Sequence, residues 1–222
     1  AKSINFWDMR SRRPLVRTLR GHTDQVTSLA IHSPSWTLLS GSRDQSVRAW
    51  DIRMGRVKFT SREHFGSICC LGVTNERASE FISGAKDSSI KVWNSSGKCL
   101  RTMRNHRGAV HSISFLEEGG RDYRSSRIVS GSADANVRLW NIREGRCMKI
   151  LRGHKAPVKV VCWPTESKVV SGARDGKLKV WNLKESRCVR TLEGHTGSIT
   201  GLVCGSKSAV SSSKDGTLRV WD

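Results

Sequence analysis

Serine, histidine and aspartate, the residue types of a hydrolase triad, recur together five times along this 222-residue chain. In such a triad the serine attacks the substrate, the histidine takes its proton, and the aspartate orients the histidine. One active site needs one triad rather than five, and the chain lacks the Gly-x-Ser-x-Gly turn that presents a nucleophilic serine in α/β hydrolases. A hydrolase therefore has little support. The five sets are His22, Ser40 and Asp44; His64, Ser83 and Asp87; His106, Ser130 and Asp134; His154, Ser171 and Asp175; and His195, Ser211 and Asp215.

A tryptophan follows each of these aspartates after six residues, and Asp or Asn comes directly after it. A further tryptophan, Trp7, lies near the start of the chain, and successive tryptophans of this series are about 40 to 47 residues apart. A period of this length indicates a repeat protein, in which each repeat buries its apolar face against its neighbours. The five tryptophans are Trp50, Trp93, Trp140, Trp181 and Trp221.

Each period contains four short apolar segments separated by turn residues. In the first period, the expected strands cover residues 15–19, 26–31, 37–40 and 47–50. Gly, Asp, Ser and Pro lie between these segments, and no repeat shows the apolar spacing of a helix. The sequence therefore predicts an all-β fold.

We expect a single domain made of five repeats, at residues 9–51, 52–94, 95–141, 142–182 and 183–222, preceded at residues 1–8 by the end of a truncated repeat. The third repeat is the longest. Its extra residues lie in the polar segment 117–124, which we expect to be a surface loop between two strands. Because the chain opens inside a repeat, we expect it to be part of a larger chain or complex.

Charge and cysteine usage limit the classes of function. The chain has 39 Lys and Arg against 19 Asp and Glu, and its formal net charge of +20 attracts nucleic acid, acidic peptides or anionic surfaces.

None of the seven cysteines forms a Cys-x-x-Cys motif. Cys99, Cys147 and Cys188 share one repeat position with Leu15 and Val57, which predicts buried small apolar residues rather than metal or redox sites. We therefore expect no metal, no cofactor, and a reducing compartment, the cytoplasm or the nucleus. No apolar run reaches the roughly 20 residues that a membrane span needs.

The order and spacing of Gly-His, Ser-Gly-Ser-x-Asp and Trp-Asp closely resemble the WD-repeat β-propeller family over essentially the whole chain. The resemblance implies four-stranded blades in which the first strand of each repeat completes the preceding blade. It thus implies a partial propeller of four complete blades plus two incomplete end blades. It also implies a non-enzymatic scaffold for protein–protein interactions. The repeats are similar in style to those of F-box/WD-repeat substrate receptors, but these residues contain no F-box, so the subclass stays open.

The same resemblance gives the repeated Ser, His and Asp, together with the five tryptophans, a structural role. It implies that in each blade the Asp bonds the His ring, the His bonds the Ser, and the Ser meets the indole N–H of the Trp. Buried polar groups are tolerated when they are paired in this way. Glu63 and Asn105 replace the glycine of Gly-His in the second and third repeats, and we expect the network to persist there with altered turns.

The resemblance also implies a ligand-binding site on the narrow top face, which is built from the loop after Gly-His and the turn before the network Asp. The residue before that Asp is a recurrent peptide contact in the family, and here it is basic in four of five repeats. A second contact position lies near the start of the strand after Gly-His. Basic side chains there suit phosphate or carboxylate groups of acidic or phosphorylated segments, although simple charge decoration of exposed turns is an alternative. The candidates are Arg43, Lys86, Arg174 and Lys214 at the first position, and His111 and Lys159 at the second.

RNA or ribonucleoprotein binding through dispersed charge is the alternative function. Basic residues also occur in the turns of the opposite face and at one repeated position of the closing strands, where we expect the side chains to point into solvent. His32 is likewise expected to be solvated. Against RNA, six of the eight tryptophans are committed to the blades, and only Tyr123 and Trp36 remain for base stacking. The closing-strand residues are Arg48, Lys91, Arg138, Lys179 and Arg219.

Overall fold

The computed structural model describes residues 1–10, 14–74, 80–115, 127–205 and 208–222. These residues form 21 strands and one turn of 3-10 helix, η1 (Ser33–Ser35), and none of them lies in an α-helix. The all-β prediction is confirmed. The chain divides into two compact units, Ala1–Asp87 with Lys91–Arg101, and Ser88–Ile90 with Thr102–Asp222.

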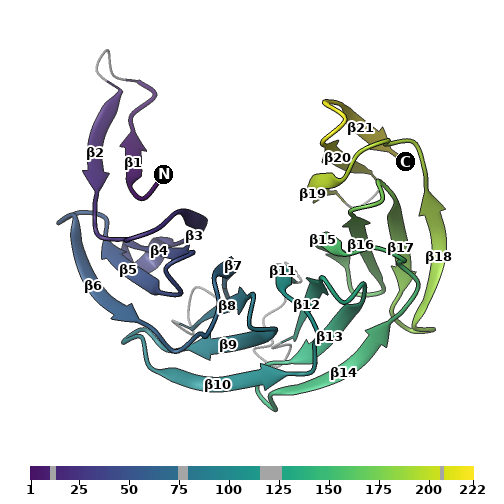
Figure 1. Ribbon diagram of the computed structural model, residues 1–222, viewed down its shortest axis with the longest axis horizontal. Helices are drawn as coiled ribbons and strands as arrows, with labels where there is room; N and C mark the ends of the chain where they lie inside the picture. The colour runs from purple at the N-terminus through teal and green to yellow at the C-terminus, as the bar shows by residue number, and fades with distance from the viewer. Residues whose placement is uncertain (11–13, 75–79, 116–126, 206–207) are drawn as a thin grey trace. The chain divides into compact units, whose positions relative to one another are not determined.

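The first unit begins with a two-stranded sheet of β1 (Ile4–Trp7) and β2 (Leu15–Leu19). A four-stranded sheet follows, made of β3 (Val26–His32), β4 (Thr37–Ser42), β5 (Val47–Asp51) and β6 (Arg56–Ser61). Most of the next four-stranded sheet also belongs to this unit, with β7 (Ile68–Val73), β8 (Phe81–Ala85), β9 (Ser89–Trp93) and β10 (Cys99–Arg104). Consecutive strands are neighbours in every sheet (Figure 1).

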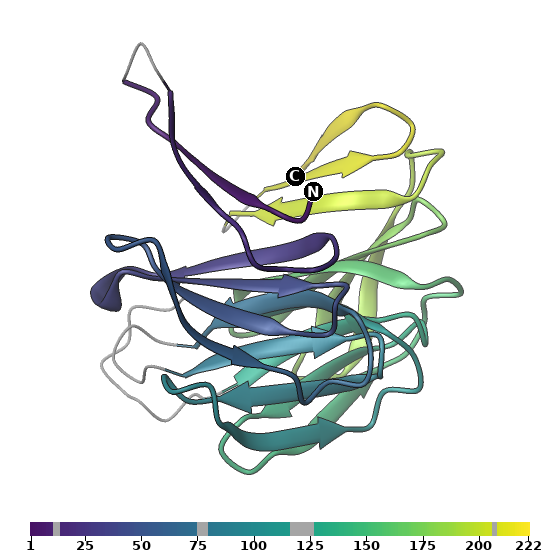
Figure 2. The same cartoon turned by 60° about the vertical axis from the view of Figure 1, so that its left-hand side comes forward.

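The second unit contains two more four-stranded sheets and one three-stranded sheet. The first consists of β11 (Val110–Phe115), β12 (Arg127–Ser132), β13 (Val137–Asn141) and β14 (Arg146–Leu151). The second consists of β15 (Val158–Thr165), β16 (Lys168–Ala173), β17 (Leu178–Asn182) and β18 (Arg187–Leu192). The three-stranded sheet consists of β19 (Ile199–Cys204), β20 (Ala209–Ser213) and β21 (Leu218–Trp221). Each is an antiparallel meander (Figures 1 and 2). The described residues therefore form four complete blades and two incomplete ones, as predicted.

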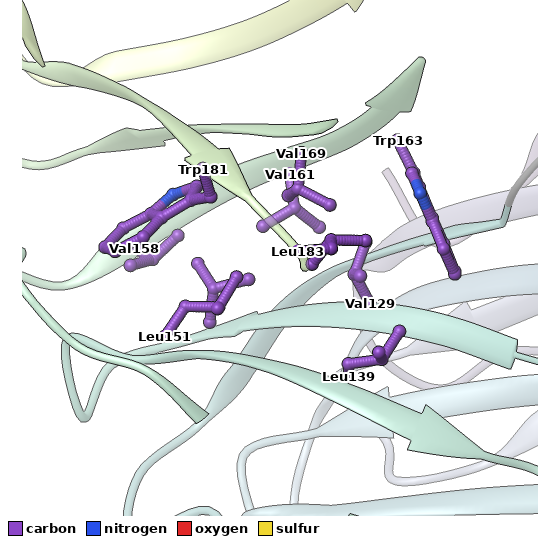
Figure 3. Close-up of a cluster of buried hydrophobic side chains, with 10 residues drawn as sticks. Val129, Leu139, Leu151, Val158, Val161, Trp163, Val169, Trp181 and Leu183 are labelled. Carbon is purple, nitrogen blue, oxygen red and sulfur yellow. The ribbon is translucent and has the colours of Figure 1, made fainter. Parts of the chain in front are cut away.

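Neighbouring sheets of the second unit pack face to face through apolar side chains. Leu139 of β13 and Leu151 of β14 lie in one buried cluster with Val158 of β15 and Trp181 of β17 (Figure 3). Val158, Leu151 and Trp181 are fully buried. Because a fully buried aliphatic side chain contributes about 1.5–3 kcal/mol, this cluster is a main source of the unit's stability.

The glycine of the repeated Ser-Gly phrase allows the sheets to approach closely. A Cβ atom on Gly131 of β12 would lie 2.6 Å from a methyl group of Val158 in the next sheet, and one on Gly172 of β16 would lie 2.6 Å from Ile199. Atoms cannot come that close without displacement, so glycine is required where the first strand of the next sheet passes over it.

Two expectations about polar residues are wrong. The closing-strand basic side chains do not all point into solvent, since Lys91 and Arg138 are each only 5% exposed. Arg138 is buried because its guanidinium bonds to Asn105 and Asp134 rather than to water. His32 is also buried, at 7% exposed, because its ring nitrogen Nδ1 is hydrogen-bonded to the Ser35 hydroxyl at 2.5 Å.

The repeat position of the three cysteines is less buried than predicted. Cys99, Cys147 and Cys188 are half-buried, whereas Leu15 and Val57 are 48% and 41% exposed. This position lies on the last strand of its sheet, β2, β6, β10, β14 or β18, at the sheet edge, so only part of each side chain is covered. The predicted surface loop 117–124, with Tyr123, lies outside the described residues.

Candidate functional site

A hydrogen-bonded chain of four side chains joins the strands of sheet β3–β6. The indole N–H of Trp50 donates to Ser40 Oγ at 2.8 Å, Ser40 Oγ lies 2.7 Å from His22 Nε2, and His22 Nδ1 lies 2.8 Å from Asp44 Oδ2. One histidine tautomer satisfies every contact: the hydroxyl donates to Nε2 and Nδ1–H donates to the carboxylate. The same chain, with distances of 2.7–2.9 Å, runs through His64, His106 and His195 in their sheets.

Burial and hydrogen bonding fix the charge states of this network. Burial lowers the pKa of His22, which keeps the ring neutral. Burial alone would raise the pKa of Asp44, but the hydrogen bonds from Ser46 and His22 outweigh it, and the pKa falls well below its ordinary value. Ser40 is 0% exposed and already bonded on both sides, so its hydroxyl cannot reach a substrate. The geometry is that of internal bracing rather than of a nucleophile.

The network of sheet β15–β18 is open, contrary to the expectation for the fourth repeat. Trp181 and His154 both bond Ser171 Oγ at 2.8 Å, but Nδ1 of His154 has no hydrogen-bond partner among the described residues. The Asp175 side chain accepts the backbone N–H of Lys177, a bond that Asp44, Asp134 and Asp215 also accept in the closed networks. Burial lowers the pKa of His154 to about 4, so this ring is neutral, and its Nδ1 atom is unpaired among the described residues.

A local difference in sequence accompanies the open network. In sheet β3–β6 the hydroxyl of Ser46, two residues after the aspartate, donates to Asp44 Oδ1 at 2.6 Å and holds the carboxylate toward the histidine. Thr217 does the same for Asp215 at 2.7 Å. Lys177 takes this position in sheet β15–β18, and its Nζ is drawn to Glu193 at 2.6 Å.

The four predicted basic residues before the network aspartates occupy one backbone position. Each main-chain N–H donates to a carbonyl in the loop before the sheet's first strand, and the four side chains are exposed. Arg43 and Lys86 belong to the first unit, and Arg174 and Lys214 belong to the second. The turn therefore fixes the base of each side chain and leaves its charged end free to meet a ligand. The N–H donors bond Gln25 (2.8 Å), Ser67, Pro157 and Ser198 (2.9 Å each).

The second predicted position coincides with a β-bulge at the start of the first strand in five of the six sheets, all except that of β1 and β2. The register of β11 with β12 shifts between Val110 and Ser112, and that of β15 with β16 shifts between Val158 and Val160. Bulges re-aim a side chain, and here they bring the predicted pair together, with Lys159 Nζ 3.0 Å from His111 Nε2. Both side chains are half-buried. A half-buried lysine next to an imidazole is a suitable donor pair for one anionic group.

Arg138 belongs to the network of its sheet, which sequence reasoning missed. Its terminal nitrogens donate to Asn105 Oδ1 at 2.8 Å and to Asp134 Oδ2 at 3.1 Å. The signal was present in the sequence, because Asn105 replaces the glycine of Gly-His. A Cβ atom on Gly21 would lie 2.7 Å from the Arg48 guanidinium, and one on Gly194 would lie 2.6 Å from the Arg219 guanidinium, so in the first and fifth repeats glycine leaves room for the arginine against the backbone.

Comparison with known proteins identifies the repeats. The family model described as "WD domain, G-beta repeat" matches residues 13–51, 55–94, 97–141, 145–182 and 186–222. The chain belongs to the WD-repeat family. No helix in the described part of this WD-repeat chain has the length and apolarity to cross a membrane. In the same residues, no three His, Cys, Asp or Glu side chains gather as a set that could hold a metal ion.

Several curated proteins are similar in sequence to this WD-repeat chain. A nuclear distribution protein PAC1 of Arthroderma otae is 25% identical over 185 residues, covering 73% of this chain and 39% of the relative. A mitochondrial division protein 1 of Saccharomyces cerevisiae is 32% identical over 119 residues, covering 44% of this chain and 16% of the relative. The chain thus spans about two fifths or less of the length of these relatives.

Proposed function

We propose that this WD-repeat chain is a non-enzymatic scaffold that binds acidic or phosphorylated segments of other proteins through its top-face residues. These are Arg43, Lys86, Arg174, Lys214, His111 and Lys159. The observation that carries the proposal is the repeated placement of an exposed basic side chain on a turn whose backbone is fixed. The carboxylates of Asp44, Asp87 and Asp215, each next to one of these basic residues, bond the network histidines in the interior of their sheets. Charge-assisted hydrogen bonds from such groups suit phosphates and carboxylates.

The absence of an enzymatic role rests on the burial of the repeated serines, each of which is at most 1% exposed. The relatives are also named for cellular processes, nuclear distribution and mitochondrial division, rather than for reactions. Such names fit a scaffold, and we place the chain in the cytoplasm or the nucleus, as part of a larger protein or complex.

RNA or ribonucleoprotein binding is the second candidate, favoured by the net charge of +20. The stacking surface for it is small. Three aromatic side chains of the described residues are well exposed, Phe65 at 82%, Trp7 at 59% and Trp36 at 49%, and the Arg53 guanidinium lies 4.4 Å over one face of the Trp36 ring. Single-strand binding by aromatic stacking therefore has little to use in the described residues.

A charge-reversal comparison tests the proposal. Arg43, Arg174 and Lys214 are changed together to Glu, and the chain is applied to an array of phosphorylated, acidic and neutral peptides and to single-stranded RNA. The matched control changes three exposed basic residues of the opposite turns and strands, Arg56, Lys98 and Lys184, to Glu. We expect peptide binding to be lost only in the top-face variant, with RNA binding weakened modestly in both. Collapse of RNA affinity with no bound peptide on any array would establish the second candidate instead.

A further inference from the structure

A basic hollow of about 300 Å³ lies at one end of sheet β11–β14 in the second unit. Its walls come from the loop before β11, the start of β13 and the end of β14. Its volume is at the lower end of the range for small-molecule sites, about 300–1,000 Å³. Three arginines and two asparagines line it, and no acidic side chain does. The lining residues are Asn105, Arg107, Asn136, Arg138, Ile150 and Arg152.

Arg138 is the fixed part of the hollow. Its side chain is only 6% exposed and is held by Asn105 and Asp134. The Asp134 carboxylate, the nearest negative charge, also accepts the backbone N–H groups of Arg107 and Asn136 at 3.0 Å each. Because that carboxylate is already saturated with donors, it does not compete for the rest of the hollow.

Arg107 and Arg152 are the adjustable part of the hollow. Both side chains are exposed, and neither forms an ion pair with another described residue. The two long side chains can therefore close on an incoming anion from the solvent side while Arg138 stays in place. Three guanidinium groups then converge on one small volume.

The corresponding positions of sheet β15–β18 are occupied differently. There Lys177 pairs with Glu193 at 2.6 Å, and Lys179 donates to Thr191 Oγ1 at 2.8 Å, so the basic groups are satisfied internally. In sheet β11–β14, Ile150 occupies the position that Thr191 has in sheet β15–β18, and its side chain has no hydrogen-bond acceptor. Arg138 therefore turns toward the loop before β11, and the arginines beside it are left for an external ligand.

We propose that this hollow binds a terminal phosphate group. The planar guanidinium fork matches phosphate oxygens two at a time, and a tetrahedral dianion can accept from three guanidinium groups and an amide at once. A carboxylate is planar and singly charged and would leave several of these donors unused. Ile150 provides an apolar wall for the carbon next to the phosphate. The site uses none of the top-face residues, so it does not depend on the proposed function.

Calorimetric titration of the full chain with O-phosphoserine, inorganic phosphate, sulfate and serine at constant ionic strength tests the site. The variant combines Arg107→Gln with Arg152→Gln, which removes two exposed charges and leaves the Arg138 contacts intact. Its matched control combines Arg62→Gln with Arg104→Gln, exposed arginines at the position of Arg152 in the two preceding sheets. We expect saturable binding of O-phosphoserine or inorganic phosphate, at least a tenfold loss in the variant, and less than a twofold change in the control.

The relative affinities identify the source of the phosphate. Tighter binding of O-phosphoserine than of inorganic phosphate supports a phosphorylated protein segment, and the reverse supports a free phosphate compound. Failure of the wild-type chain to bind either probe overturns the proposal, as does an equal loss in the two double variants. Binding of a short RNA through Arg107 and Arg152 without any binding of O-phosphoserine would also overturn it.

Discussion

Replacing Lys177 by serine is expected to complete the open network of sheet β15–β18. The hydroxyls of Ser46 and Thr217 hold the network aspartate toward its histidine in two other sheets. Lys177 lacks this hydroxyl, and Nδ1 of His154 is left without a partner among the described residues. A serine at this position would draw the Asp175 carboxylate back, so that it accepts the Nδ1 proton of His154.

The free energy of unfolding should rise by about 1 to 2 kcal/mol. A hydrogen bond to a charged group contributes about 1.5–3 kcal/mol. Losing the exposed ion pair of Lys177 with Glu193 costs little, because solvent screens it. Lys177→Ala is the control, because it removes the same ion pair without supplying a hydroxyl. Guanidinium unfolding followed by tryptophan fluorescence measures both variants under the same conditions.

The pH dependence of stability provides a second readout. Burial lowers the pKa of His154 from 6.5 to about 4, so the folded protein binds fewer protons than the unfolded chain between these pH values. Stability is therefore lost as the pH falls through this window, with a slope of at most about 1.4 kcal/mol per pH unit from this one group. The restored bond to Asp175 raises the pKa of His154, so the serine variant should lose less stability than the alanine variant. Equal stabilities and equal pH slopes for the two variants would refute the account of the open network.

Three further changes have defined outcomes. Gly131→Ala should lower the free energy of unfolding by about 1–3 kcal/mol, because its Cβ would meet Val158, and thermal unfolding measures this. Ser130→Ala should cost about 2–4 kcal/mol by leaving the indole N–H of Trp140 and Nε2 of His106 unpaired; a loss below 0.5 kcal/mol in denaturant unfolding would contradict the network's role. Trp163→Phe should change the free energy of unfolding by less than about 1 kcal/mol in the same assay. The buried indole N–H of Trp163 has no partner among the described residues, so its removal loses no hydrogen bond there.

The sequence was sufficient to predict the blades because every one of them repeats the same physical requirements. Trp50, Ser40, His22 and Asp44 recur as a set, and a set that recurs in each blade has a structural explanation. The role of the glycine in the Ser-Gly phrase emerged only from the structure, where a neighbouring strand lies against Gly131 and Gly172. The prediction of four complete and two incomplete blades came from these repeated residues together with the resemblance to the WD-repeat family.

The contacts that could not be predicted are those in which a side chain depends on a partner from another part of the repeat. Alternation along β13 indicated that Arg138 points outward, but its length lets the guanidinium return to Asn105 and Asp134. The loss of the His154 bond depended on Lys177, whose preference for Glu193 is not visible in the spacing of the motif. The ligand-binding role of the top-face residues stays a prediction.

The most direct measurement of the central claim is the affinity of the Arg43→Glu chain for a phosphorylated peptide selected on the array, determined by fluorescence anisotropy. Arg43 lies between Ser40 and Asp44 of the network, yet its side chain is exposed. We predict at least a tenfold loss of affinity with the free energy of unfolding unchanged within about 0.5 kcal/mol, the usual range for a surface substitution. Unchanged affinity combined with a stability loss of several kcal/mol would contradict the claim that the repeated residues hold the fold while the basic residue beside them binds the partner.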